Sequence, residues 1–155
     1  MAALTLACNG STPVDFAGTY TVTVVNGASN PCNLANWTPG NSTGSIPVTM
    51  TQDNTTAQFG VGGLAGAYLD LVLETSTFPG TVMGDTFTAT YLGTKTQTQQ
   101  TCSYTINMTL AATLTSDTSL NGTLTYSSTT NGDPACGAIT GCMQEQTVVG
   151  VRTAQ

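Results

Sequence analysis

The sequence predicts an all-β protein: a single antiparallel up-and-down meander of eight or nine strands, closed into a barrel. Three observations predict this class. Hydrophobic residues recur at every second position, residues typical of tight turns separate these runs, and most connections are short. Short links favour antiparallel neighbours, because parallel neighbours need crossovers of a dozen or more residues. A two-sheet sandwich is the alternative, although sandwiches tend to use long Greek-key returns.

The first four predicted strands carry hydrophobic residues at alternate positions, which places these side chains on one buried face. No stretch shows a convincing helical periodicity. The strands and their inward residues are, in chain order, 18–25 with Tyr20, Val22 and Val24; 45–52 with Ile46, Val48 and Met50; a third with Ala57, Phe59 and Val61; and 67–74 with Leu69, Leu71 and Leu73.

The clearest alternation lies in residues 86–91, where Phe87, Ala89 and Tyr91 share one face and three threonines share the other. The remaining predicted strands are 81–83, 99–115, 119–127 and 143–153. The residues that share the inward face of 99–115 are Cys102, Tyr104, Ile106, Met108 and Leu110. The pair Ala111 and Ala112 breaks this alternation and predicts a β-bulge.

Turn residues fall between the predicted strands, as a meander requires. The predicted turns are Asp53-Asn54, Gly62-Gly63 with Gly66, Pro79-Gly80, Gly84-Asp85 and Ser116-Asp117.

Charge and composition exclude several classes of function. Charged residues make up 6% of the 155-residue chain, with 2 basic residues, 8 acidic residues and no histidine. A nucleic-acid partner is excluded, because phosphate binding requires a basic patch. The missing histidine removes every Ser-His or Cys-His catalytic pair. Hydrophobic residues at 39% argue against disorder, and no apolar run reaches the roughly 18 residues needed to span a bilayer.

The N-terminal residues Met1-Ala-Ala-Leu-Thr-Leu-Ala-Cys8 form a short apolar stretch that ends in Ala-Cys. This stretch resembles the end of a bacterial lipoprotein signal peptide, in which the cysteine becomes the lipidated first residue. The resemblance implies that residues 1–13 are a signal-peptide remnant or tether and that 14–155 form one barrel domain. It also implies lipidation at Cys8, which would be the only attachment to a membrane.

The cysteines predict disulfides and an oxidising compartment. With Cys8 assigned to an anchor, an even set remains, consisting of Cys32, Cys102, Cys136 and Cys142. We predict the pair Cys136–Cys142, which lies within one predicted loop, and by elimination Cys32–Cys102, among three possible pairings. A zinc site is the rival, but the chain has no Cys-x-x-Cys and no histidine. Disulfides indicate a periplasmic, cell-surface or secreted protein.

A second resemblance lies at the two ends of the predicted meander. Asp15-Phe-Ala-Gly-Thr-Tyr20 opens the first strand, and the last strand ends in Val151-Arg152. This pattern is similar to lipocalins and avidins, in which a Gly-x-Trp motif opens the barrel and an arginine of the last strand covers the aromatic ring. The resemblance implies a cation–ring contact between Arg152 and Tyr20, which takes the place of the tryptophan.

Two long segments predict where a ligand would bind. Residues 26–44 hold the only tryptophan, Trp37, and Cys32, while residues 128–141 hold Cys136. Loops of this length are usually functional or disordered, and in a barrel they can cap one mouth. We predict a binding site for a small apolar or amphipathic molecule, although the same residues also suit an ordinary core. Its predicted residues are Tyr20, Trp37, Phe87, Tyr91, Tyr104, Met108 and Tyr126.

Two alternative functions stay open. One is a small histidine-free barrel enzyme, a cyclase, isomerase or hydrolase, that uses tyrosines and carboxylates; no catalytic residue is identified. Asp70 and Glu74 share a predicted strand face, but four strand residues span about 13 Å, too far for a glycosidase pair. The other alternative is a surface or assembly protein that pairs exposed strand edges. We expect no cofactor and no metal, and the oligomeric state is not predicted.

Overall fold

The strands of the protein follow the predicted meander closely. The structure is a computed structural model that describes residues 12–34 and 37–153. Cys8 and its predicted lipidation lie outside the described residues. The strands are β1 (Gly18–Asn26), β2 (Ser42–Asp53), β3 (Thr56–Val61), β4 (Thr77–Met83), β5 (Thr86–Tyr91), β6 (Gln97–Gln99), β7 (Cys102–Ser116), β8 (Ser119–Thr130) and β9 (Met143–Arg152).

Pairing between β5 and β7 closes eight antiparallel strands into a barrel, which confirms the predicted fold class. The strand order is β5-β4-β3-β2-β1-β9-β8-β7, so that each strand pairs with its neighbours in the chain and β9 pairs with β1. Strand β6 is additional: it pairs with the first residues of β7, beyond the end of β5.

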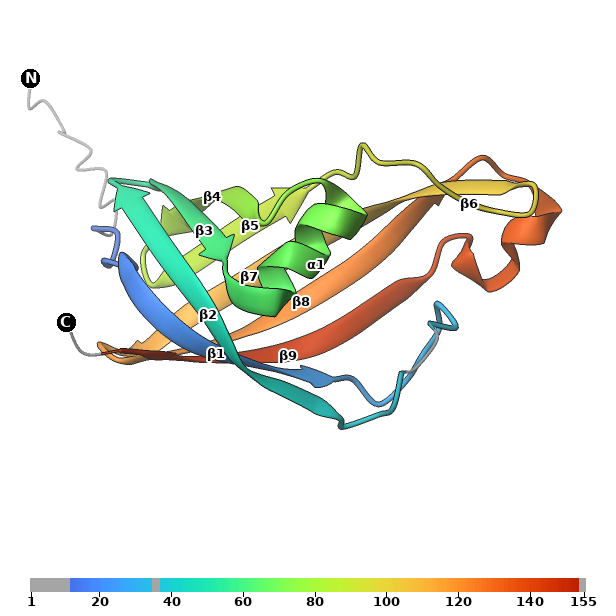
Figure 1. Ribbon diagram of the computed structural model, residues 1–155. Helices are drawn as coiled ribbons and strands as arrows, with labels where there is room; N and C mark the ends of the chain where they lie inside the picture. Colours follow the sequence, from blue (N-terminus) through green and yellow to red (C-terminus); the bar gives the residue numbers. More distant parts are fainter. Residues whose placement is uncertain (1–11, 35–36, 154–155) are drawn as a thin grey trace, which may run out of the picture.

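The long strands continue past the short ones. Tyr91, the last residue of β5, pairs with Met108, so that the first residues of β7 lie beyond the closed barrel. Figure 1 shows β7, β8 and β9 extending past β4 and β5 toward the end where β6 lies. We call this end the mouth; the opposite end, which carries the β2–β3, β4–β5 and β7–β8 turns, is the closed end.

Aromatic rings fill the interior of the barrel toward the closed end. Phe78 and Phe87 are fully buried, and Phe59 stacks on Phe78 with 4.9 Å between ring centroids. Phe59 also meets Phe87 edge to face at 6.0 Å, and the tilted ring of Phe16 lies 6.0 Å from Phe87. Such tilted and offset pairs are favourable and leave little free volume. The closed end is therefore packed core rather than a container.

The predicted turn at Pro79-Gly80 is wrong, because both residues lie inside β4. Gly80 pairs with Ala89 of β5, and a Cβ atom on Gly80 would lie 2.5 Å from Cε2 of Phe87. A glycine inside a strand often marks such a close approach. Gly80 is needed here so that the Phe87 ring can cover the backbone of β4.

The predicted strand at residues 67–74 is also wrong: this segment belongs to helix α1 (Gly63–Leu73). The helix turns Leu69, Val72 and Leu73 toward the core, whereas Leu71 is 68% exposed. The run from Ala67 to Leu73 is almost entirely apolar, so that it satisfies a spacing of two and a spacing of 3.6 equally well. The helix ends at Glu74, which adopts the left-handed conformation with φ 63°.

The predicted β-bulge at Ala111 and Ala112 is wrong as well. Ala111 pairs with Thr123 and Ala112 with Gly122 in regular register, and the irregularity lies between Leu114 and Ser116. Ala111 is exposed and Ala112 is buried, so that the alternation continues through the pair. The prediction was wrong because Ala111, although apolar, lies on the outer face of the strand.

Tyr20 and Arg152 meet at the closed end. Nε of Arg152 donates a hydrogen bond of 2.9 Å to the Tyr20 hydroxyl, and the guanidinium carbon lies 5.2 Å from the ring centroid. The hydroxyl in turn donates to the carbonyl of Phe16 at 2.9 Å. These contacts seat the residues before β1 over the closed end.

Within the described ranges, no helix combines the length and the apolar character that crossing a membrane requires.

Candidate functional site

Two connections form the mouth, and a disulfide joins them. The β1–β2 loop (residues 27–41) and the β8–β9 segment (residues 131–142) are linked by Cys32–Cys142. The second disulfide, Cys102–Cys136, ties the β8–β9 segment to the first residue of β7. The four predicted cysteines are thus all oxidised, but both predicted pairings are wrong.

The reason for the different pairing is the 3₁₀ helix η1 (Pro134–Ile139). This helix separates Cys136 from Cys142 and brings Cys136 to Cys102, with 4.9 Å between their Cα atoms. Cys142 lies at the start of β9 and meets the β1–β2 loop instead, with 5.1 Å between the Cα atoms of Cys142 and Cys32. Closeness along the chain was therefore a poor guide to closeness in space.

Local hydrogen bonds fix the β8–β9 segment. Oδ1 of Asp133 accepts from the backbone N–H of Ala135 at 2.8 Å, which caps the start of η1. The same oxygen accepts from the hydroxyl of Thr101 at 3.0 Å, and Nδ2 of Asn131 donates to the carbonyl of Thr101 at 3.0 Å. The segment is therefore held against the β6–β7 turn independently of the disulfides.

The β1–β2 loop lies against β9. The backbone N–H of Gly27 donates to the carbonyl of Glu145 at 2.9 Å, and a Cβ atom on Gly27 would lie 2.7 Å from that oxygen. Gln144, which is 1% exposed, donates through Nε2 to the carbonyl of Ser29. The indole N–H of Trp37 donates to the carbonyl of Gly27 at 3.3 Å. These bonds position Trp37 at the mouth.

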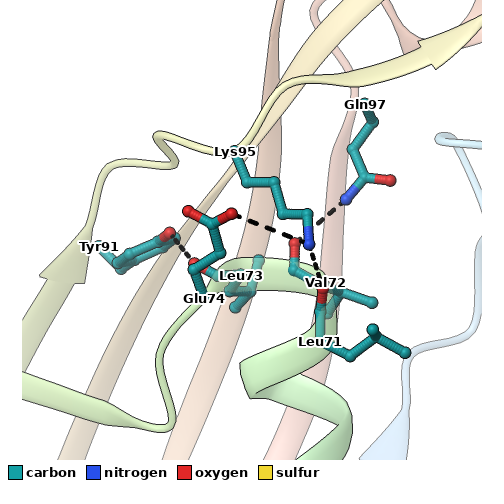
Figure 2. A network of polar contacts seen from close by, with 7 residues as sticks. All are labelled: Leu71, Val72, Leu73, Glu74, Tyr91, Lys95 and Gln97. Atoms are coloured by element: carbon teal, nitrogen blue, oxygen red, sulfur yellow. Dashed lines mark hydrogen bonds and ion pairs between the residues drawn. The ribbon is translucent and has the colours of Figure 1, made fainter.

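Helix α1 forms the floor of the mouth, and side chains from β5, β6 and the chain between them hold its C-terminal end (Figure 2). The hydroxyl of Tyr91 donates to the carbonyl of Leu73 at 2.5 Å. Gln97 donates through Nε2 to the carbonyl of Val72 at 3.1 Å, and Nζ of Lys95 donates to the carbonyl of Leu71 at 2.5 Å. The last carbonyls of a helix have no partner within the helix, and a cation near them is favourable. Tyr91 and Gln97 each donate to one of these carbonyls, and Lys95 supplies both a donor and the cation.

The mouth contains a cavity of about 940 Å³ between α1, the two connections and the inner face of β7, β8 and β9. Leucine and isoleucine side chains, both disulfides and four aromatic rings line it together with amides and hydroxyls. Its aromatic residues are Trp37, Tyr68, Tyr104 and Tyr126. Its carboxamides are Asn26, Asn33, Asn41, Gln97, Gln99 and Gln146.

No Asp, Glu, Lys or Arg is among the described residues that line this cavity. Its polar groups form a connected chain instead. The hydroxyl of Tyr126 donates to Oε1 of Gln146 at 3.1 Å, and Nε2 of Gln146 donates to Oδ1 of Asn26 at 2.8 Å. Nδ2 of Asn26 continues to the carbonyl of Thr38 at 3.1 Å. The wall is therefore uncharged and organised by hydrogen bonds.

Tyr126 stays protonated at physiological pH. Burial raises the pKa of the Tyr126 phenol to about 12, and the neighbouring Tyr68 adds to the increase. The phenol consequently acts as a hydrogen-bond donor toward Gln146 and is unsuited to remove a proton near pH 7.

The structure separates the predicted binding residues into three groups. Trp37, Tyr104 and Tyr126 line the mouth cavity together. Tyr20 and Phe87 lie in the packed core, where they are 1% and 0% exposed. Tyr91 and Met108 lie between the two regions: Tyr91 holds α1, and Met108 is buried. Neither of them lines the cavity.

Sequence reasoning missed the carboxamides and the helical contribution to the cavity. Asn33, Asn41, Gln97 and Gln99 lie in or near connections, where no periodic pattern distinguishes them. Tyr68 and Leu69 lie inside the predicted strand 67–74, whereas the structure places them on α1 at the floor of the mouth. The pair Gly62-Gly63 before the apolar run could have indicated the helix, because glycines permit the change of chain direction at which a helix can begin.

The helix also changes the geometry of Asp70 and Glu74. Asp70 lies on α1 and Glu74 is the residue that ends the helix, so that neither lies on a strand face, and both are exposed. Oε1 of Glu74 lies 3.9 Å from Nζ of Lys95, so that Glu74 belongs to the polar network at the end of α1. The expected 13 Å separation along a strand therefore does not apply.

A smaller cleft of about 340 Å³ lies at the closed end beside Asp15, Asp85, Asp117 and Arg152. Nη2 of Arg152 donates to the carbonyl of Asp15 at 2.6 Å, so that its charge is already engaged. Within the described ranges, no three His, Cys, Asp or Glu side chains converge in a way that could hold a metal ion. The mouth cavity is the better candidate site.

Comparisons of the chain with protein-family models, with curated proteins and with solved structures found no match. The function is therefore inferred from the cavity and its residues.

Proposed function

We propose that this chain is an exported bacterial binding protein that holds a small amphipathic molecule in the cavity at the mouth of its barrel. The observation that carries the proposal is the cavity of about 940 Å³ above a barrel interior that aromatic rings already fill. Pockets for small molecules usually have volumes of about 300–1,000 Å³ and combine an apolar wall with a few polar groups. The mouth cavity has this size and composition, and two disulfides hold its rim.

The composition of the wall favours binding over catalysis. General acid–base catalysis needs a group whose pKa lies near the working pH. The described lining residues offer only tyrosines as titratable groups, and burial raises the pKa of Tyr126 to about 12. A role in assembly through strand edges also has less support, since pairing between β5 and β7 closes the barrel and the additional strand β6 is only 3 residues long.

Export is supported by the two disulfides, which are consistent with an oxidising compartment outside the cytosol. We further propose that Cys8, which follows Ala7 after a short apolar stretch, carries a lipid anchor. In its own host, the protein is then expected in the detergent phase after Triton X-114 partition, and a Cys8→Ser variant in the aqueous phase. Equal partition of both proteins would refute the anchor and leave the binding role untouched.

Native mass spectrometry of protein purified from its own host tests the binding role. The expected result is an adduct of discrete mass that dissociates on activation. An Ala138→Trp variant is expected to lose the adduct, because Ala138 is exposed and lines the cavity. Ala111→Trp is the matched control, since Ala111 is exposed on β7 and does not line the cavity. Adduct-free wild-type protein, or loss of the adduct in both variants, would overturn the proposal.

A further inference from the structure

The charges of the mouth restrict the chemical class of its ligand. The chain has 2 basic residues, and neither lines the cavity: Lys95 donates to the carbonyl of Leu71 at the end of α1, and Arg152 bonds to Tyr20 at the closed end. No described lining residue is acidic either. A buried charge without a partner is costly, and the net charge of −6 further disfavours anions. The wall therefore favours an uncharged ligand.

The hydrogen-bonding groups of the wall argue against a pure hydrocarbon. Carboxamides both donate and accept hydrogen bonds, as do the hydroxyls of Tyr104, Ser127 and Ser128, which also line the cavity. Tyr126, Gln146 and Asn26 already bond to one another, but the side chains of Asn41, Gln99 and Tyr104 have no hydrogen-bond partner among the described residues. A lipid tail that covered these three side chains would strip them of water without replacing the hydrogen bonds. A ligand rich in hydroxyl or acetamido groups can both donate hydrogen bonds to these side chains and accept hydrogen bonds from them.

The aromatic rings require an apolar face on the same ligand. Trp37 comes from the β1–β2 loop, Tyr68 from α1, Tyr104 from β7 and Tyr126 from β8, so that rings border the cavity on several sides. A sugar ring presents C–H groups on its faces and hydroxyls around its edge, and it can therefore use rings and amides together. Tyr68 is 63% exposed and Leu34 is 43% exposed, which leaves the cavity open to a chain longer than one sugar.

We propose that the mouth cavity binds a neutral oligosaccharide. This inference rests on the proposed binding function and names its ligand class. A neutral lipid is the competing class, and an acidic glycan would find no basic partner among the described lining residues.

A glycan array probed with the labelled full chain tests the inference. The array carries neutral, sialylated, sulfated and uronic-acid oligosaccharides. A parallel titration follows Trp37 fluorescence with monolaurin as the lipid probe. The expected result is binding to neutral glycans alone, little changed between low and high salt. Binding that depends on acidic glycans would overturn the inference. So would a Trp37 response to monolaurin without any glycan signal, but this outcome would leave the proposed function standing. Absence of both signals and of a native adduct would overturn both proposals.

Variants locate the binding on the cavity. Tyr104→Leu is expected to raise the Kd for the best neutral glycan about tenfold, through loss of the ring, while Tyr104→Phe retains most of the affinity. Ala138→Trp, which adds bulk at an exposed position, is expected to abolish binding even if Tyr104→Leu folds poorly. Met83→Ala is the control, because Met83 is 79% exposed at the closed end. Unchanged affinity in both Tyr104→Leu and Ala138→Trp would place the glycan elsewhere and overturn the inference.

Discussion

Cys32 and Cys142 lie 110 residues apart in the sequence, and the bond between their sulfurs joins the two connections that form the mouth. Cys102 and Cys136 add a second tie with a separation of 34 residues. Because Cys32, Cys136 and Cys142 all line the cavity, the disulfides are part of the candidate site as well as of the scaffold.

The two disulfides are expected to differ in their effect on stability. A disulfide that closes a longer loop removes more entropy from the unfolded chain. For closed loops of 110 and 34 residues, the chain-entropy relation gives losses of about 5 and about 4 kcal/mol in the free energy of unfolding. Urea unfolding of Cys32→Ala/Cys142→Ala and of Cys102→Ala/Cys136→Ala measures both. A larger loss in the second variant would contradict the expectation.

Removal of the Tyr91 hydroxyl is expected to loosen α1. Tyr91→Phe removes the bond to the carbonyl of Leu73 but keeps the edge contact with Phe78, whose ring centroid lies 5.7 Å away. The variant is expected to lose about 0.5–1.5 kcal/mol in the free energy of unfolding. Relative to the wild type, its amide hydrogens are expected to exchange faster in α1, with a smaller change in the strands. Tyr68→Phe is the control, because it removes an exposed hydroxyl from the same helix. Equal exchange in both variants would show that Tyr91 does not hold the helix.

Tyr20 and Arg152 are expected to be energetically coupled. Tyr20→Phe would deprive both the guanidinium of Arg152 and the carbonyl of Phe16 of a partner, at a cost of about 1–3 kcal/mol. A double-mutant cycle with Arg152→Met, followed by urea unfolding, is expected to give a coupling of at least about 0.5 kcal/mol. Additive losses would mean that the contact contributes nothing to stability.

Tyr126 makes the stability of the protein sensitive to alkaline pH. Its pKa is raised from 10.0 to about 12 in the folded state, so that folding favours the protonated phenol. The resulting stability is fully present below pH 10 and is lost as the pH rises through about 12, because the folded chain then binds more protons than the unfolded chain. The loss amounts to roughly 3 kcal/mol at most, for a rise of about two pKa units.

Absorbance at 295 nm and urea unfolding between pH 9 and 12 measure this effect. The Tyr126→Phe variant is expected to lack the last-ionising phenol and to lose less stability over that pH range. An identical pH profile in the wild type and in Tyr126→Phe would assign the alkaline sensitivity to another group.

The alternation of hydrophobic and polar residues predicted most of the strands, and the short connections favoured a barrel over a sandwich. In β5, each inward residue, such as Phe87 and Ala89, is flanked by outward threonines, and a shift of one residue would bury the threonines. Short turns such as Gly84-Asp85 then determine which strands are neighbours. Local pattern and turn chemistry point to the same arrangement, and this agreement makes the prediction robust.

The elements at the mouth were harder to predict, because long-range contacts determine them. Helix α1 carries an apolar run that suits either period, and its conformation depends on partners such as Tyr91, 18 residues away from Leu73. The disulfide pairing depends on the path of η1. Of the cavity carboxamides, Asn33 and Asn41 lie in the β1–β2 loop and Gln97 and Gln99 in the three-residue strand β6, where a sequence pattern does not tell which way a side chain points. Trp37 was identified because it is the only tryptophan and stands in a long loop.

The most direct test is an NMR comparison of the protein with the molecule that it retains from its own host and after removal of that molecule. The account predicts shifts in the resonances of Trp37, Tyr104 and Tyr126 and little change at Tyr20 and Phe87, because the ligand occupies the mouth and the barrel interior is filled. Shifts centred on Tyr20 and Phe87, or on the outer face of the strands, would contradict it.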